Sequence, residues 1–161
     1  MTGFGQILSD LNRAGIRYVL VGGIALIRHG VARATRDIDA VLEPGEENLD
    51  RLRTLIAEWG ATRPDGSPIP VESITEGKTI HLATPHGALD LLPDRTAPLS
   101  FAELMDRADV RRVDGVEAPI CSLADLVALK RIASRGRDLA DLSELEAAHG
   151  ELPDSRENES R

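Results

Sequence analysis

The stretch "VGGIALIRHGVARATRDIDAVLE", residues Val21–Glu43, shows how strands and helices alternate in this chain. It overlaps the apolar run "RYVLV" (Arg17–Val21), which is typical of a short strand. Gly22 and Gly23 follow that run directly, and the apolar spacing of "IALIRH" behind them predicts a brief helix that ends at Gly30. The glycine pair therefore indicates a tight turn from a strand into a helix.

The second half of the same stretch predicts a strand with one buried side. Polar and apolar residues alternate in "RDIDAVLE", so one face carries Asp37, Asp39 and Val41 and the other carries Ile38, Ala40 and Leu42. Two carboxylates on one face repel each other unless one pKa rises or a cation lies between them. Mg²⁺ prefers oxygen ligands and would satisfy both acids. Alone, the D-x-D spacing is more typical of a solvated strand end, so the metal interpretation needs a third acid.

The remaining sequence predicts further helices and two β-hairpins. Helical spacing of apolar residues predicts helices over residues 4–11, 47–59, 101–108 and 123–135, and a last helix that follows a break at Gly136 and runs to about His149. Alternation around turn residues predicts hairpins over residues 79–93 and 110–120. Residues 60–78 are rich in Gly and Pro, which favours a loop or an irregular edge structure.

These elements predict an α+β fold in which helices flank a small mixed β-sheet. The length of 161 residues suits one domain, which we expect over residues 1–150. Residues 151–161 form a polar tail that we expect to be disordered. The order of the strands in the sheet does not follow from the sequence.

Composition excludes several classes of function. Aromatic residues make up only 2% of the chain, which argues against a base-stacking platform for single-stranded nucleic acid. The net charge of −8 gives no overall basic field for nucleic acid, although a local basic patch stays possible. Cys121 is the single cysteine, so an internal disulfide is excluded and a reducing cytoplasm is expected. The sequence shows neither a signal peptide nor an apolar run long enough to span a bilayer, so no membrane partner is expected.

Asp90 in "ALDLLP" is the candidate third acid. Alternation places it on one strand face with Ala88 and Leu92. Burying an unpaired charge costs several kcal/mol, so this carboxylate faces solvent or has a partner. Beside Asp37 and Asp39 it would complete a two-metal cluster or act as a base for an attacking hydroxyl.

Several basic residues could contact phosphate. Arg33 and Arg36 lie in the loop that leads into the acid pair, and arginine binds phosphate oxygens in a bidentate manner. Lys130 lies on the helix after Ser122 and could point back into a triphosphate pocket, although periodicity does not show that it does. Further along, the spacing of Arg137 and Asp141 predicts an i,i+4 surface ion pair.

Taken together, "GGIALIRHGVARATRDIDAVL" resembles the signature of the nucleotidyltransferase superfamily, and most of all the minimal domains related to AbiEii-type toxins. These share the run G-G-x-A-L-x-x-H-G-x-x-R-x-T-x-D-I-D, which matches residues 22–39 here. The run "LKRIASRGRDLADL" also resembles the K-x-x-A-x-R-x-K-D-x-x-D-L ending of that family, with Arg137 where Lys is commoner. The resemblance spans about residues 17–142.

The resemblance implies a site and an activity. Asp37, Asp39 and, as the third acid, Asp90 would bind two Mg²⁺ ions. Gly22 and Gly23 would hold the nucleotide phosphates. An NTP would then give its NMP to an acceptor hydroxyl on tRNA, a protein or a small molecule. The resemblance also implies a place in a toxin-antitoxin system, with a cognate toxin or antitoxin as partner. The alternative is a nucleotide-binding or protein-interaction module of the same fold that acts as an antitoxin or regulator without turnover.

Overall fold

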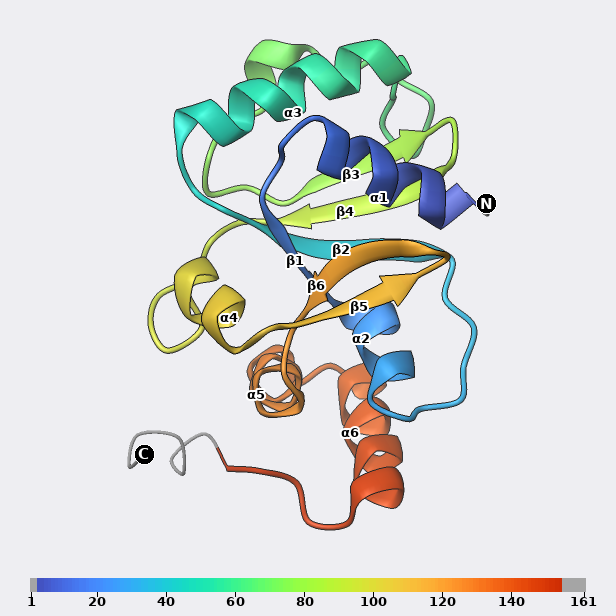
Figure 1. Ribbon diagram of the computed structural model, residues 1–161, viewed down its shortest axis with the longest axis vertical. Coiled ribbons are helices and arrows are strands. Elements are labelled where there is room, and N and C mark those ends of the chain that lie inside the picture. Colours follow the sequence, from blue (N-terminus) through green and yellow to red (C-terminus); the bar gives the residue numbers. More distant parts are fainter. Residues whose placement is uncertain (1–2, 155–161) are drawn as a thin grey trace.

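The strands of the chain form one mixed β-sheet in the computed structural model, which describes residues 3–154. The order across the sheet is β3-β4-β2-β1-β6-β5 (Figure 1). The strands are β1 (Tyr18–Val21), β2 (Asp37–Leu42), β3 (Ile80–Thr84), β4 (Gly87–Leu92), β5 (Asp109–Val113) and β6 (Val116–Ile120). Both predicted hairpins are present, as the antiparallel pairs β3–β4 and β5–β6. The predicted α+β fold with a mixed sheet is confirmed.

Parallel and antiparallel pairing meet at the centre of this sheet. Strand β1 runs antiparallel to β2 and parallel to β6, and β2 runs parallel to β4. The register of β2 and β4 places Asp39 opposite Asp90. On the other side of β2, Val21 at the end of β1 is the partner of Asp39. The end of β1, the glycine turn and the two acid-bearing strands therefore meet at one place.

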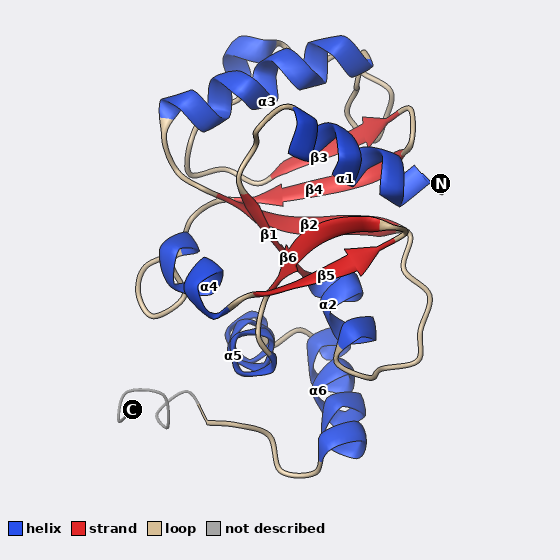
Figure 2. Ribbon diagram, in the orientation of Figure 1, coloured by secondary structure: helices blue, strands red, loops and turns tan. Residues whose placement is uncertain are grey.

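Helices cover the sheet on both sides, with α1 and α3 above it and α2, α5 and α6 below it in the view of Figure 2. The helices are α1 (Gly3–Arg13), α2 (Gly22–Arg28), α3 (Glu46–Trp59), α4 (Phe101–Arg107), α5 (Leu123–Ala133) and α6 (Gly136–His149), with the short 3₁₀ helix η1 (Val71–Ser73) in the loop before β3. Serine side chains cap α4 and α5, in both cases accepting a hydrogen bond from the backbone N–H three residues later. These caps explain why both helices begin where the sequence predicts.

Strand β2 is more deeply buried than its alternation predicts. Ile38 and Ala40 are fully buried, as expected, but Val41 on the opposite face is fully buried too. Because successive side chains point to opposite faces, both faces of the sheet are covered at that end of β2. The prediction of one buried side holds only at the other end of the strand, where Asp37 and Asp39 are half-buried.

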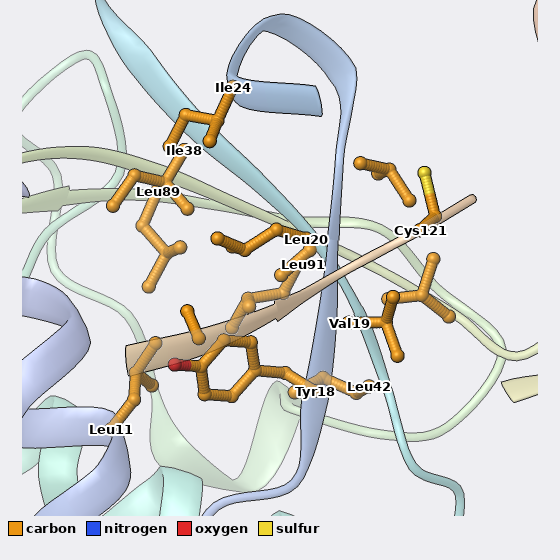
Figure 3. Packing of buried hydrophobic residues seen from close by; sticks show 14 of the residues in the cluster. Leu11, Tyr18, Val19, Leu20, Ile24, Ile38, Leu42, Leu89, Leu91 and Cys121 are labelled. Atoms are coloured by element: carbon orange, nitrogen blue, oxygen red, sulfur yellow. The ribbon is translucent and has the colours of Figure 1, made fainter. Parts of the chain in front are cut away.

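The apolar core lies around β1, β2 and β4 (Figure 3). Leu20, Ile38, Leu89 and Leu91 are all fully buried within it. Tyr18 supplies an aromatic ring to this core, and its hydroxyl donates to Asn12 Oδ1 at 2.9 Å. Because aromatic residues are scarce, aliphatic side chains of the central strands fill most of the core.

Two helix boundaries differ from their predictions. Helix α2 begins at Gly22 rather than after the glycine pair. Helix α5 ends at Ala133, and Ser134 takes the left-handed conformation with φ 47°. Gly136, predicted to break the helix, is instead the first residue of α6. The break is therefore made by the backbone of Ser134, which no glycine or proline indicates in the sequence.

The end of the chain is anchored as far as it is described. Leu152 is partly buried against the core, and Arg131 Nη1 donates to the Pro153 carbonyl at 3.0 Å. Residues 155–161, which the sequence predicts to be disordered, lie outside the described residues. Between residues 3 and 154, no helix combines the length and the apolarity needed to cross a bilayer.

Candidate active site

Three carboxylates converge at the end of the paired strands β2 and β4. Asp37 and Asp39 project from the same face of β2, and Asp90 lies beside Asp39 because the two residues are partners in the parallel register. One carboxylate oxygen from each acid lies within 4.8 Å of the other two, and all three residues are half-buried. The structure therefore brings together the three acids that the sequence singles out, which we call the acid triad.

The acid triad has an excess of negative charge. Burial, together with the charges of Asp37 and Asp90, raises the pKa of Asp39 to about 6. A hydrogen bond from the Gly23 backbone N–H and the charge of Lys130 act in the opposite direction without cancelling the effect. Three convergent oxygen donors with uncompensated negative charge are the ligand set that suits a hard divalent cation such as Mg²⁺.

Neighbouring side chains hold two of these acids. The Thr35 hydroxyl donates to the backbone carbonyl of Asp37 at 3.1 Å and lies 3.4 Å from its Oδ1. His81 on β3 places Nδ1 2.7 Å from Asp90 Oδ1. His81 could have been found from the predicted hairpin, because it is the strand partner of Asp90. Thr35 gives no such signal, since it precedes the strand and belongs to a loop.

The glycine turn packs directly against the acid triad. Gly22 has φ +64°, and a Cβ at this residue would lie only 2.8 Å from Asp39 Cβ. A Cβ at Gly23 would lie 2.5 Å from Thr35 Oγ1. Both residues lie at the start of α2, and both have to be small because side chains of the site occupy the space beside them.

A cavity of about 460 Å³ opens in front of the acid triad. One wall consists of the triad and the glycine turn, and the opposite wall consists of α5 and the start of α6. Basic side chains line it at Arg33, Arg95, Lys130, Arg135 and Arg137. The cavity thus joins an acidic wall to a basic one, which is a charge distribution suited to a phosphate ligand with its metal ion.

On the α5–α6 wall the buried acids are paired within the chain. Lys130 Nζ lies 3.2 Å from Asp138 Oδ1 and 2.9 Å from Asp141 Oδ2. Arg33 Nη1 lies 2.6 Å from Asp141 Oδ1, and Arg135 Nε lies 2.8 Å from Asp138 Oδ2. We call these five residues the salt-bridge cluster. Although burial raises the pKa of Asp138, the hydrogen bonds from Arg135 and Lys130 hold it below its usual value.

The salt-bridge cluster corrects one prediction from the sequence. Asp141 does not form the predicted surface pair with Arg137, because its carboxylate is buried and bonded to Arg33 and Lys130. Arg33 reaches it from a residue 108 positions earlier in the chain. Local helical spacing contains no information about a partner at that separation, so the sequence analysis missed both buried acids, Asp138 and Asp141.

The predicted phosphate contacts fall into different environments. Lys130 and Arg33 line the cavity but are held by the salt-bridge cluster. Arg36 is exposed and is not part of the cavity lining. Arg95 and Arg137 line the cavity and form no ion pair with any residue between 3 and 154. Arg95 lies in the loop after β4, where no periodicity indicates a role.

Solved structures of other proteins share this fold. An antigenic nucleotidyltransferase-like protein from Paracoccidioides brasiliensis shares the fold with a TM-score of 0.61 at 16% identity, over 89% of this chain and 72% of that one. The antibiotic-resistance factor ANT(2'')-Ia has a TM-score of 0.59 at 14% identity, over 92% and 83%. The lincosamide antibiotic adenylyltransferase LnuA has a TM-score of 0.58 at 14% identity, over 91% and 96%.

These structural likenesses concern the fold. A search of curated proteins found no match. The sequence itself matches, over residues 6–158, the family described as "Nucleotidyl transferase AbiEii toxin, Type IV TA system". That match covers almost the whole chain, including both strands of the acid triad and both helices of the salt-bridge cluster. The chain therefore belongs to the AbiEii nucleotidyl transferase family.

Proposed function

We propose that the protein transfers an NMP from an NTP to an acceptor hydroxyl and releases pyrophosphate. The observation that carries this proposal is the convergence of Asp37, Asp39 and Asp90 within 4.8 Å at a cavity with a basic opposite wall. Membership of a nucleotidyl transferase family supports the same reaction. The proposed reaction is a phosphoryl-group displacement, in which positioning and charge stabilisation supply most of the catalysis.

Asp37, Asp39 and Asp90 would hold Mg²⁺. The sequence resemblance implies that two ions bind. Their oxygen donors and the raised pKa of Asp39 fit a site that requires positive charge from outside the chain. When bound, the metal supplies positive charge that stabilises the phosphoryl oxygens and the departing pyrophosphate. The part played by the protein is to fix the three carboxylates on two paired strands.

The triphosphate would lie between Arg137 on the α5–α6 wall and Arg95 in the loop after β4. Arg95 and Arg137 supply positive charge that no carboxylate of the described chain offsets, so we assign them the main phosphate contacts. Lys130 and Arg33 share their charge with buried acids and would act mainly by shaping the wall. Arg36 would contact only a nucleotide that extends beyond the cavity.

The glycine turn would bring the nucleotide close to the triad. The Gly23 backbone N–H already donates to the Asp39 carboxylate, so its first effect is to orient that acid. The absence of a side chain at Gly22 and Gly23 leaves the backbone accessible from the cavity that both residues line. A direct phosphate contact at these two residues remains a prediction from the sequence.

Asp90 would orient or deprotonate the acceptor hydroxyl, with its carboxylate held by His81. The acceptor is open among RNA, a protein and a small molecule. LnuA is named as a lincosamide antibiotic adenylyltransferase, so a small-molecule acceptor belongs in the first panel to be tested. The family description likewise motivates a search for a cognate antitoxin in the same cytoplasmic compartment.

The test combines nucleotide binding with turnover. Calorimetry with Mg²⁺ and each NTP should show binding to the wild type and a loss of metal-dependent binding in Asp39→Asn. Labelled NTP should release pyrophosphate, and Asp37→Ala and Asp39→Ala should abolish this release. Asp106→Asn changes an exposed acid on α4 outside the cavity and serves as the matched control.

The outcomes distinguish the two functions. Binding of NTP without any transfer, across the panel of acceptors, would favour the nucleotide-binding regulator over the enzyme. Absence of NTP binding, or activity that survives both aspartate substitutions, would overturn nucleotidyl transfer by this site.

A further inference from the structure

Thr35 lies between the glycine turn and the acid triad. It is half-buried in the loop that leads into β2, and it lines the cavity. Its hydroxyl donates to the Asp37 carbonyl at 3.1 Å and lies 3.4 Å from Asp37 Oδ1. The single hydroxyl hydrogen of Thr35 is thus shared between the backbone carbonyl and the carboxylate of the first acid of the triad.

The space for Thr35 is provided by Gly23. A Cβ at Gly23 would lie 2.5 Å from Thr35 Oγ1 and 2.9 Å from Thr35 Cβ, both closer than two such atoms can approach. The φ angle of Gly23 is not positive, in contrast to +64° at Gly22, so its backbone conformation does not require glycine. Steric exclusion by Thr35 is therefore the reason that residue 23 has no side chain.

The two glycines of the turn serve two different acids. Gly22 leaves room for Asp39, whose side chain would overlap any Cβ there. Gly23 leaves room for Thr35, which in turn holds Asp37. The turn and the D-x-D strand are in this way matched residue by residue, with one glycine for each acid.

From this packing we propose that Thr35 is a positioning residue that orients Asp37 within the acid triad, and that Gly23 is glycine in order to admit Thr35. The inference rests on the proposed function in so far as Asp37 binds a metal ion. Side chains that orient metal ligands fix the direction of the donor atom, and their loss typically weakens metal binding or activity by about 10–100-fold.

The first experiment measures metal binding rather than turnover. Mn²⁺ titrated into the purified protein, followed by electron paramagnetic resonance, reports the affinity of the triad without nucleotide. Thr35→Val keeps the volume and removes the hydroxyl, so we expect Mn²⁺ affinity to fall by about 10–100-fold. Thr35→Ser keeps the hydroxyl and should restore the affinity to within about threefold of the wild type.

The second experiment tests the steric relation through stability. Gly23→Ala forces the new Cβ against Thr35, and we expect a clearly lower Tm. Thr35→Ala removes the nearest atom, Oγ1, so Gly23→Ala should lower the Tm less in a Thr35→Ala background than in the wild type. Gly136→Ala is the matched control, because Gly136 has no positive φ and nothing lies within 4 Å of the added Cβ. That control should leave the Tm unchanged or raise it.

The two experiments fail separately. Wild-type Mn²⁺ affinity in Thr35→Val would overturn the positioning role, whatever the transfer activity. Equal losses of Tm from Gly23→Ala in both backgrounds would overturn the steric role of Thr35. A wild type that binds no Mn²⁺ would overturn the proposed function together with the positioning role, and the stability cycle would then decide the steric part alone.

Discussion

Aspartates on the two walls of the cavity lie in opposite electrostatic environments. On the strand wall, Asp37, Asp39 and Asp90 lie together with little positive charge near them, and the pKa of Asp39 rises to about 6. On the helix wall, Asp138 and Asp141 are more deeply buried, yet basic side chains offset both. The difference shows which buried carboxylates the chain neutralises with its own basic side chains. The buried acids of the helix wall are neutralised within the chain, whereas the acids of the strand wall need a cation.

The largest effect on stability is expected on the helix wall. Asp138→Ala removes a buried acid and leaves Lys130 with one partner fewer. Breaking a buried ion pair by removing one partner typically costs about 3–5 kcal/mol, and we expect about 3 kcal/mol in the free energy of unfolding, measured by urea denaturation. Asp109→Ala breaks an exposed pair with Arg111 and should cost less than about 1 kcal/mol. Equal costs for the two variants would contradict the contrast between the walls.

On the strand wall the sign should reverse. Asp39→Asn removes a charge that is unfavourable in the metal-free protein, so we expect the free energy of unfolding at pH 7.5 to increase by about 1–3 kcal/mol. Saturating Mg²⁺ should stabilise the wild type and leave Asp39→Asn unaffected, because the variant lacks a ligand. Thermal unfolding with and without Mg²⁺ measures both effects. A metal-free variant that is less stable than the wild type would show that the acid triad is already compensated.

The two walls should also respond differently to pH. In the folded protein the pKa of Asp39 is raised to about 6 from 3.8, so between these values the folded state binds a proton that the unfolded state does not. Stability from this group therefore increases as the pH falls from 7 to 4, and the advantage of Asp39→Asn should shrink over the same range. The pKa of Asp138 is lowered, so its contribution is present above 3.8 and is lost only at more acidic pH. Denaturation curves at several pH values measure both trends, and an Asp39→Asn advantage independent of pH would contradict the first.

The smallest effect on stability is expected from the basic residues without partners. Arg95→Ala and Arg137→Ala should change the free energy of unfolding by less than about 0.5 kcal/mol, because neither side chain forms an ion pair within residues 3–154. Each should raise the KM for NTP by about 10-fold through the loss of a phosphate contact. Arg112→Ala, on the exposed strand β5, is the control and should change neither quantity. An unchanged KM in both cavity variants would contradict the assignment of the triphosphate to these two arginines.

The sequence predicts most of the helices and strands and the three acids on the strand wall of the cavity. Alternation of side chains predicts both acid-bearing strands, because the period of two is a local property of a strand. The convergence of Asp90 on Asp39 follows from strand order, and that order depends on how the helices pack. Likewise, the partnership of Arg33 with Asp141 joins residues 108 positions apart, and only the folded chain creates it.

Predictions from local sequence patterns were wrong where contacts between distant residues determine the structure. Spacing pairs Arg137 with Asp141 on a helix surface, yet the buried carboxylate turns toward Lys130 instead. The end of α5 is set by the left-handed backbone of Ser134, a residue type that rarely takes that conformation. Thr35 is a matched residue of the family run, but its role comes from the space beside Gly23, which only the folded chain shows.

The register between β2 and β4 links the acid triad to the interior of the protein. Leu89 and Leu91 flank Asp90 along the strand and are fully buried, so they fix which residue stands opposite Asp39. A slip of one position would turn Asp90 into the core and present a leucine to the cavity. Substitution of Leu89 or Leu91 is therefore expected to disturb the acid triad as well as the stability, even though neither leucine lines the cavity.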